Sequence, residues 1–290
     1  MPDAAPNTAY VLDMPARRTS CVVFASPHSG RIYPDTLLQR SVLNRNMIRS
    51  SEDAYVDQLY ASVAEFGAPL LAAAMPRAYL DLNRSSDELD PALIQGARRH
   101  GHNPRVSSGL GVIPRVVANG RAIYSGKLTM DEARLRIDRY WRPYHGRLKS
   151  LLTESRDMFG QAILIDCHSM PHEAVAMAGG PHSARPEIVL GDRFGAAASG
   201  VIVDQIEAAF ADAGLHVARN TPFAGAYVTQ TYGRPTRHQH AIQIEIDRSL
   251  YMDEDTIQPN GNFETLRDLL RQVTAQIASI GSDPMSLAAE

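Results

Sequence analysis

The chain has 290 residues, of which 44% are hydrophobic and 21% charged, and its formal net charge is −3. This length and composition are typical of a globular protein with a full hydrophobic core, and they give no basic excess that would attract nucleic acid or an acidic membrane surface. No signal-peptide pattern opens the chain and no run of about 18 apolar residues occurs, so we expect a cytoplasmic protein.

The first part of the chain predicts an arm followed by a buried strand. Residues 1–19 are polar and contain proline, and we expect them to lie over the surface as an N-terminal arm. CVVFAS at 21–26 is a continuous apolar run, which is typical of a strand buried on both faces. It ends in a polar turn that contains His28. Taken alone, such a histidine more often contacts solvent than binds a ligand.

A helix is expected after this turn. Ser50 and Ser51 are plausible N-caps, and an apolar stripe follows at Val56, Leu59, Tyr60 and Val63. Asp53 and Asp57 are four residues apart and would share one face of the helix, which destabilises two carboxylates. A nearby cation would remove this penalty. Asp53 could equally interact with the helix terminus alone.

The segment 91–127 is locally basic. It follows a predicted strand at 69–74 and contains no Asp or Glu. Its Gly, Pro and Ser content predicts a loop with short strands. Such a segment could surround an anionic substrate, although a solvated basic surface is the commoner explanation. Its cationic side chains are Arg98, Arg99, Arg105, Arg115, Arg121 and Lys127.

Thr129 and Glu132 have the spacing of a capping box and predict a long helix to about residue 158, kinked at Pro143. We read the aromatic stripe of this helix as core packing. No internal repeat or low-complexity segment appears, so we expect one domain over residues 1–290. The remaining elements are expected as strands at 187–190 and 215–219, helices at 200–213 and 263–280, and a loop at 221–233.

The run QAILIDCHSMP at 161–171 predicts a central buried strand that ends in polar residues. In open α/β sheets, ligands bind beyond the carboxyl ends of the strands. Asp166 and His168 share one face, so the carboxylate could orient the imidazole, although a core histidine is an equal alternative. A Cys167 nucleophile with His168 or His172 as base is disfavoured, because adjacent side chains on a strand point to opposite faces. Cys167 and Cys21 are expected as buried free thiols.

AIQIEID at 241–247 alternates strictly, with isoleucines on one face and Gln243, Glu245 and Asp247 on the other. This alternation usually indicates an edge or half-solvated strand. The carboxylates on its polar face are candidates for chemistry.

Two histidines and two carboxylates from separate segments together suggest a metal site. Catalytic zinc typically has three nitrogen or oxygen ligands from the protein, which His28, His168 and one carboxylate would match. A second carboxylate outside the metal shell could then carry protons.

Six segments, in this order, resemble the N-formylglutamate amidohydrolase family over residues 20 to 275. They are SPHSG at 26–30, EDAYVDQLY at 52–60, YLDLNR at 79–84, LIDCHSMP at 164–171, FAGAYVTQTYGRP at 223–235 and IEIDRSLYMDE at 244–254. The resemblance implies a zinc-dependent hydrolase with a fold similar to the zinc carboxypeptidases and aspartoacylases. That fold is of the phosphorylase/hydrolase-like α/β class, with three α/β/α layers and a mixed central sheet.

The resemblance also implies roles for single residues. The metal ligands would be His28, Asp53 and His168, and Glu245 would be the general base. Glu52 is a rival to Asp53, because Arg31 stands where the carboxypeptidase H-x-x-E motif has its glutamate. One Zn²⁺ is expected per chain, although other divalent metals could bind. The candidate substrate-binding residues are Asn83, Arg84, Arg115, Tyr227 and Arg248.

The activity that the resemblance implies is hydrolysis of a small anionic N-acyl amino acid, with N-formyl-L-glutamate giving formate and L-glutamate, as in histidine degradation. Gln230 and Thr231 stand where we expect Arg and His in the histidine-degradation enzymes, so a positive charge is missing near the expected pocket. The alternatives are hydrolysis of another N-acyl amino acid or small peptide, and non-catalytic binding of acidic ligands.

Overall fold

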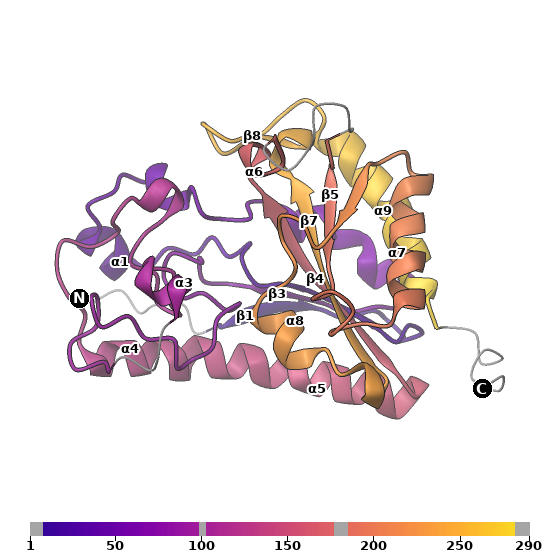
Figure 1. Ribbon diagram of the computed structural model, residues 1–290, viewed down its shortest axis with the longest axis horizontal. Coiled ribbons are helices and arrows are strands. Elements are labelled where there is room, and N and C mark those ends of the chain that lie inside the picture. Colours follow the sequence, from indigo (N-terminus) through magenta and orange to yellow (C-terminus); the bar gives the residue numbers. More distant parts are fainter. Residues whose placement is uncertain (1–7, 99–102, 177–184, 282–290) are drawn as a thin grey trace. The chain divides into compact units, whose positions relative to one another are not determined.

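The computed structural model describes residues 8–98, 103–176 and 185–281, and its largest element is a seven-stranded sheet (Figure 1). The strands are β1 Tyr10–Asp13, β2 Val22–Ser26, β3 Leu70–Ala73, β4 Ala162–Met170, β5 Ile188–Gly191, β6 Val217–Arg219 and β7 Gln239–Asp247. Their order in the sheet is β1-β3-β2-β4-β7-β5-β6. Strand β4 is parallel to β2 and β7, whereas β5 is antiparallel to β7, so the sheet is mixed as predicted. A separate pair is formed by β8 Met252–Asp253 and β9 Gln258–Pro259.

The strands that carry site residues are buried along their length. Every residue of β2 and β4 is buried, as their continuous apolar runs predicted. Strand β7 is also buried beyond its first residue and lies between β4 and β5. The interpretation of β7 as an edge or half-solvated strand is therefore wrong, because β7 has a neighbouring strand on each side and both of its faces are buried. Strand β1 falls within the expected N-terminal arm.

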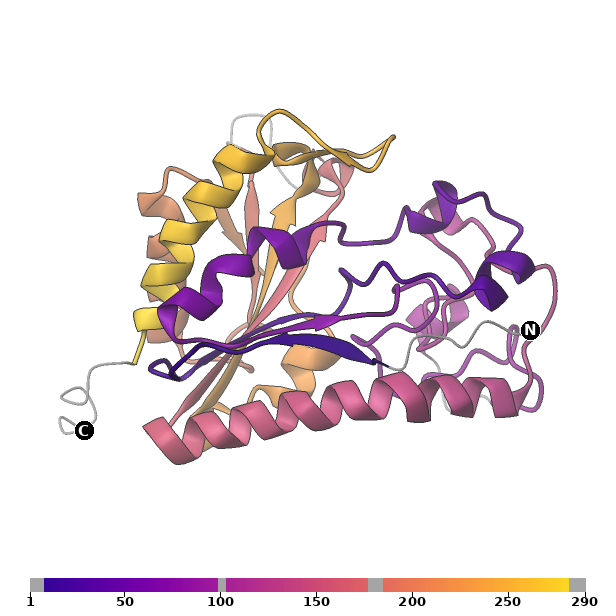
Figure 2. The same ribbon diagram turned by 180° about the vertical axis from the view of Figure 1, so that it is seen from behind.

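Helices cover both faces of this sheet. In Figures 1 and 2, α7 (Gly200–Asp212) and α9 (Phe263–Ser279) lie side by side against one face, and α8 (Tyr227–Tyr232) lies against the other. The core stripe of α9 recurs every three or four residues, as expected for a helix with one buried face. It consists of Phe263, Leu266, Leu270, Val273 and Ile277. The three-layer α/β/α class is confirmed.

The other helices are short except for one. They are α1 Asp35–Arg40, α2 Val56–Leu59, α3 Pro104–Ser107, α4 Met130–Arg136, α5 Arg142–Phe159 and α6 His172–Ala176. 3₁₀ turns occur at Met47–Arg49, Ala61–Phe66, Ala118–Gly120, Pro235–Arg237 and Arg248–Leu250. No helix among the described residues is long and apolar enough to cross a bilayer.

The expected helix after residue 50 is shorter than predicted. Tyr55 has φ 67°, a conformation that interrupts a right-handed helix, so α2 begins only at Val56. The Ser50 hydroxyl donates to the Met47 carbonyl at 2.8 Å and does not cap a helix. Asp53 therefore precedes the helix, and the argument that it shares a helix face with Asp57 was wrong.

The long helix after residue 129 begins as predicted. The Thr129 hydroxyl accepts a hydrogen bond from the Glu132 amide at 3.2 Å. A π-helical turn at Ile137–Trp141 then precedes α5 and Pro143. Proline lacks an amide donor and its ring clashes with the carbonyl four residues earlier, so a widened turn at this point relieves the clash.

Two predicted loops contain helices instead. Residues 221–233 include α8, and the described part of 91–127 contains α3 and a 3₁₀ turn with only isolated β-bridges in place of short strands. Arg99, one of the basic residues of this segment, lies outside the described residues. Lys127 donates to the Pro91 carbonyl at 3.0 Å.

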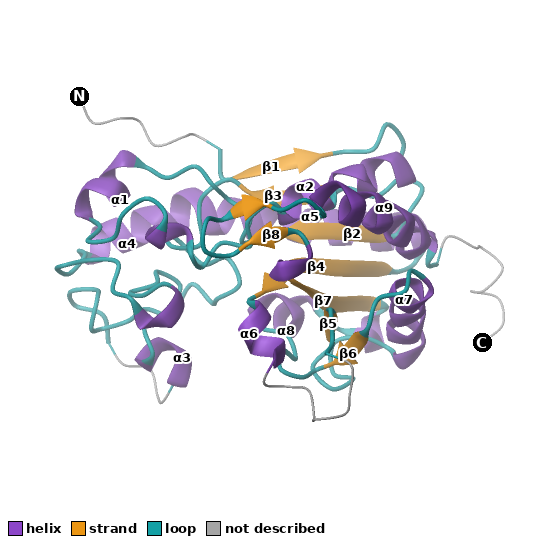
Figure 3. Cartoon of the chain, turned by 90° about the horizontal axis from the view of Figure 1, so that it is seen from above, coloured by secondary structure: helices purple, strands orange, loops and turns teal. Residues whose placement is uncertain are grey.

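Contacts divide the chain into two compact units. The first consists of Met1–Val11, Pro27–Ala54 and Ala72–Arg147, and the second of Leu12–Ser26, Tyr55–Leu71 and Leu148–Glu290. In the second unit, strands β2, β4 and β7 lie side by side (Figure 3). That the whole chain acts as one domain stays a prediction.

Candidate metal centre

The turn that carries His28 depends on a glycine. A Cβ atom at Gly30 would lie 2.0 Å from the Met75 carbonyl oxygen, which no side chain tolerates. The main chain around Gly30 can therefore run close to residues 74 and 75, and the Ile32 amide donates to the Ala74 carbonyl at 3.1 Å. This packing fixes the turn and, with it, the position of the His28 main chain.

The imidazole of His28 lies between two carboxylates. Its Nδ1 atom is 3.4 Å from Oδ2 of Asp53, and its Nε2 atom is 2.7 Å from Oδ1 of Asp81. All three side chains are buried. When Nε2 carries the proton and donates it to Asp81, Nδ1 keeps its lone pair on the side of Asp53. A carboxylate that holds the outer nitrogen in this way is typical of metal-binding histidines.

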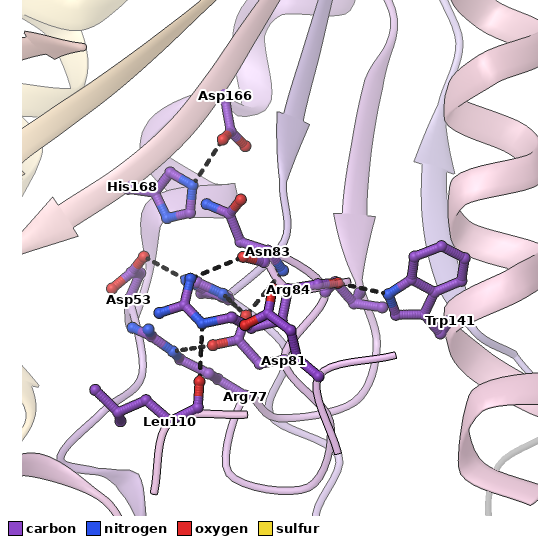
Figure 4. Close-up of polar contacts among 12 residues, drawn as sticks. Asp53, Arg77, Asp81, Asn83, Arg84, Leu110, Trp141, Asp166 and His168 are labelled. Carbon is purple, nitrogen blue, oxygen red and sulfur yellow. Dashed lines mark hydrogen bonds and ion pairs between the residues drawn. The ribbon is translucent and has the colours of Figure 1, made fainter. Parts of the chain in front are cut away.

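Asp81 is held in its ionised form by neighbouring cations. Its Oδ2 atom accepts from Arg77 Nε at 3.0 Å, and its Oδ1 atom accepts from the main-chain N–H of Asn83 at 2.8 Å (Figure 4). Burial raises the pKa of Asp81, but Arg77, His28 and Arg84 outweigh burial and hold this pKa well below its usual range. Sequence reasoning missed Asp81, although it stands inside the quoted segment YLDLNR.

Arg84 places a buried positive charge beside these residues. Its Nε atom donates to the Leu110 carbonyl and its Nη1 atom to the Asn83 carbonyl, both at 2.9 Å. Among the residues that the structure describes, Arg84 forms no ion pair, and the Asp81 carboxylate acts on it only without direct contact. A guanidinium in this state can accept an anionic group of a ligand.

Two side chains from the start of α5 and the turn before it hold the main chain of Leu82 and Arg84. Trp141 Nε1 donates to the Arg84 carbonyl at 2.9 Å (Figure 4), and Nε2 of His145 is 2.9 Å from the Leu82 carbonyl oxygen. The two rings contact each other with centroids 4.1 Å apart. Burial lowers the pKa of His145 to about 4, so its ring is neutral near pH 7. The helical spacing of aromatic residues in the sequence could not show whether these side chains hold the main chain of Leu82 and Arg84 or only pack in the core.

In the second unit, β4 and β7 bring four polar side chains to one face of the sheet. Oδ2 of Asp166 is 3.1 Å from Nε2 of His168, which confirms that they share a face. The strand register pairs Asp166 with Gln243 and His168 with Glu245. Partners in parallel strands point to the same side, so Glu245 lies next to His168. Gln243 Nε2 donates to Glu245 Oε1 at 2.7 Å and orients that carboxylate.

His28, Asp53 and His168 form a buried group that could hold a metal ion, because their candidate ligand atoms all lie within 4.8 Å of one another. Two imidazoles and a carboxylate are the ligand set of many catalytic zinc sites. The carboxylate of Glu52, the rival to Asp53, accepts from the Tyr33 hydroxyl at 2.7 Å and pairs with Arg49 at 3.0 Å. The geometry thus favours Asp53 over Glu52.

The other predicted substrate-binding residues have partners within the protein. Arg115 pairs with Asp90 at 2.8 Å, and Arg248 Nε donates to Ser169 Oγ at 3.1 Å. Tyr227 is the first residue of α8 and is half-buried. Arg115 and Arg248 would thus present only part of their charge to a ligand.

Cys167 is poorly suited to nucleophilic chemistry. Its side chain is fully buried, and burial, together with Asp166, raises its pKa well above the ordinary value. His172, one candidate base, instead places Nδ1 at 2.7 Å from Oδ2 of Asp247. The second cysteine, Cys21, is also an unbridged buried thiol, with a pKa raised to about 11 by burial.

The sequence and the fold of the chain are similar to those of known proteins. A family model described as N-formylglutamate amidohydrolase matches residues 20–252. N-formylglutamate deformylases from Pseudomonas putida and Pseudomonas aeruginosa are each 30% identical to the chain, over 236 and 237 residues, which cover 80% of this chain and 82% of theirs. The crystal structure of N-formylglutamate amidohydrolase from Ralstonia eutropha JMP134 aligns with a TM-score of 0.87 at 36% identity, covering 96% of this chain and 98% of that one.

Proposed function

The chain belongs to the N-formylglutamate amidohydrolase family, and from this premise we propose that it hydrolyses the amide bond of a small N-acyl acidic amino acid. The first candidate substrate is N-formyl-L-glutamate, which with water gives formate and L-glutamate. The observation that carries the proposal is the buried group of His28, Asp53 and His168, with Glu245 beside His168 in the sheet register.

The residues of this group fit a catalytic zinc ion. Asp81 and Asp166 each lie at hydrogen-bond distance from the Nε2 atom of one histidine, so the Nδ1 atom of each ring would be the nitrogen that binds a metal. Together with a carboxylate oxygen of Asp53, these two nitrogens would give three protein ligands. A zinc ion in such a site supplies Lewis acidity and lowers the pKa of water to about 7. Other divalent metals could occupy the same ligands.

Glu245 is the proposed general base. Its carboxylate takes a proton from the attacking water as oxygen bonds to the formyl carbon. It then returns that proton to the amide nitrogen as the carbon–nitrogen bond breaks, so that formate and the amine leave. The hydrogen bond from Gln243 to Oε1 supports this role, because it fixes the orientation of the carboxylate before the reaction.

Arg84 and Asn83 are the proposed anchors for a substrate carboxylate. The guanidinium of Arg84 is buried and forms no ion pair with a described residue, which favours a bidentate bond to an incoming carboxylate. Tyr227, Arg115 and Arg248 remain proposed contacts. The support for the two arginines is weaker, because each already binds a partner within the chain.

A panel of N-acyl amino acids tests this function. The purified chain would be assayed for release of the amino acid from N-formyl-, N-acetyl- and N-succinyl-L-glutamate, with N-formyl-L-leucine as the matched neutral substrate. We expect glutamate release to exceed leucine release, to stop after chelation and to return with zinc. Equal turnover of the leucine compound would contradict recognition of the acidic side chain, and absence of turnover on the whole panel would contradict the proposed activity.

A further inference from the structure

A pocket of about 350 Å³ in the second unit is lined by four basic side chains and, among the described residues, by no acidic one. Lys149 and Arg156 belong to α5. Arg237 belongs to the 3₁₀ turn before β7, and Arg234 is the residue that precedes this turn. The chain as a whole has a formal net charge of −3, so the positive charge of this pocket is opposite in sign to the net charge of the chain.

Within the ranges that the structure describes, none of these four cations forms an ion pair, whereas the exposed Arg219 in the same unit pairs with Asp204 at 2.7 Å. Nη1 of Arg234 donates to the carbonyls of Gln230 and Gly233 at 2.7 and 2.5 Å, but carbonyl groups leave its net charge in place. Clustered like charges repel each other, and a bound anion would remove that cost.

Arg156 adds a second observation. Its Nε atom is buried and has no hydrogen-bond partner among the described residues. Buried donors are nearly always paired, and Arg156 lines the pocket, so an oxygen atom of a group bound there could accept from this donor. The hydroxyl groups of Thr153 and Thr231 also line the pocket and can donate to further oxygen atoms.

Two other pockets of the protein lack this pattern. One is lined by Arg49 and Asp35, among others, and Arg49 is already paired with Glu52. The other contains both Asp87 and Asp138. Mixed charges of this kind are ordinary for a solvated surface, and they do not call for a bound anion.

We propose that the cation pocket binds a small phosphate-bearing anion, either pyrophosphate or the phosphate chain of a nucleotide. An arginine guanidinium can donate two parallel N–H bonds to two oxygen atoms of one phosphate group, and a lysine ammonium group supplies a compact positive charge. Four cations suit a ligand with several negative charges better than a monocarboxylate. The concave shape and limited volume favour a small ligand over an extended nucleic acid. This inference does not depend on the proposed hydrolase activity.

Calorimetric titration of the full chain, at fixed ionic strength, tests the proposal with pyrophosphate, orthophosphate and ADP as probes. The variant Lys149→Gln/Arg237→Gln alters two exposed side chains, so the fold should be unaffected. The control Arg267→Gln/Arg271→Gln removes the same charge from α9 in the same unit. We expect pyrophosphate to bind the first variant about tenfold or more weakly than wild type, and the control within about twofold.

Arg156→Gln, which removes the buried donor, should weaken pyrophosphate binding as well. ADP binding more tightly than pyrophosphate would identify a nucleotide, and equal binding would identify the phosphate chain alone. Absence of binding by all three probes would overturn the proposal. So would equal weakening in the first variant and the control, or a loss of binding in His28→Ala with none in Lys149→Gln/Arg237→Gln, which would assign the anion to the metal centre.

Discussion

Nε2 of His28 lies 2.7 Å from Oδ1 of Asp81, and both side chains are almost completely shielded from solvent. When the ring proton lies on Nε2, as an ionised Asp81 favours, Nδ1 is the nitrogen that faces Asp53. His168 and Asp166 repeat this arrangement at 3.1 Å. Each proposed histidine ligand is thus oriented by a carboxylate outside the metal shell, and these carboxylates should control metal affinity.

Replacing Asp81 with asparagine should weaken metal binding by about 10- to 100-fold, the usual effect of removing a carboxylate behind a histidine ligand. The side chain keeps its size but loses its charge and can present an amide donor to the ring. Competition with a chromophoric chelator measures the affinity. Asp87→Asn, at an exposed position in the same unit, is the control and should bind metal as wild type does. Equal affinity in the two variants would remove Asp81 from the metal centre.

Replacing Arg84 with lysine should raise KM for N-formyl-L-glutamate by about tenfold or more, because an ammonium group cannot bind a carboxylate bidentately. Metal content should stay unchanged. Steady-state kinetics and metal analysis check both expectations. Arg105→Lys, at an exposed position of the same unit, is the matched control. A change in metal content with an unchanged KM would mean that Arg84 supports the metal centre and does not hold the substrate.

Replacing Trp141 with phenylalanine keeps a large aromatic ring but removes the hydrogen bond to the Arg84 carbonyl. A typical bond of this kind contributes about 0.5–1.5 kcal/mol, so KM should rise by about two- to tenfold if the bond positions Arg84. The metal affinity should not change. A lower melting temperature with an unchanged KM would instead indicate a purely structural role for the indole.

His145 should make folding stability depend on pH. Burial holds its pKa near 4 in the folded protein, below the ordinary value of 6.5. Between these values the unfolded chain binds the proton and the folded chain does not, so stability falls as the pH drops from about 6.5 to 4. Wild type should lose about 3 kcal/mol more than His145→Gln over this range.

Urea unfolding of the metal-free protein at several pH values measures this difference without a contribution from metal release. His216→Gln, which alters an exposed histidine, should follow the wild-type curve. Parallel curves for wild type and His145→Gln would show that the His145 ring is not kept neutral by the fold.

Much of the sheet could be predicted from the sequence, because continuous apolar runs identify buried strands. Strands β2 and β4 and the helices α7 and α9 lie within one or two residues of their predicted bounds. The position of β7 in the sheet was not predictable from its alternating apolar and polar residues. Such alternation shows that the two faces of a strand differ, but it does not show whether the polar face is buried. Helix α2 was misplaced because nothing local in the sequence signals the positive φ of Tyr55.

The site was predictable where local geometry decided it. His28 follows an apolar strand, His168 lies near the end of another, and two-residue periodicity placed Asp166 beside His168. The partnership of Asp81 with His28 spans 53 residues, and that of Trp141 with Arg84 spans 57, so no local pattern could reveal either contact. The pairing of Glu245 with His168 required the strand register.

Metal content measured together with turnover tests the central claim most directly. Wild type and Glu245→Gln should each hold about one equivalent of zinc, whereas His28→Ala and His168→Ala should hold little. Only wild type should release glutamate from N-formyl-L-glutamate, since Glu245→Gln should lose about 10²- to 10⁴-fold in turnover. Near-normal turnover in Glu245→Gln, or full zinc content in both histidine variants, would contradict the account.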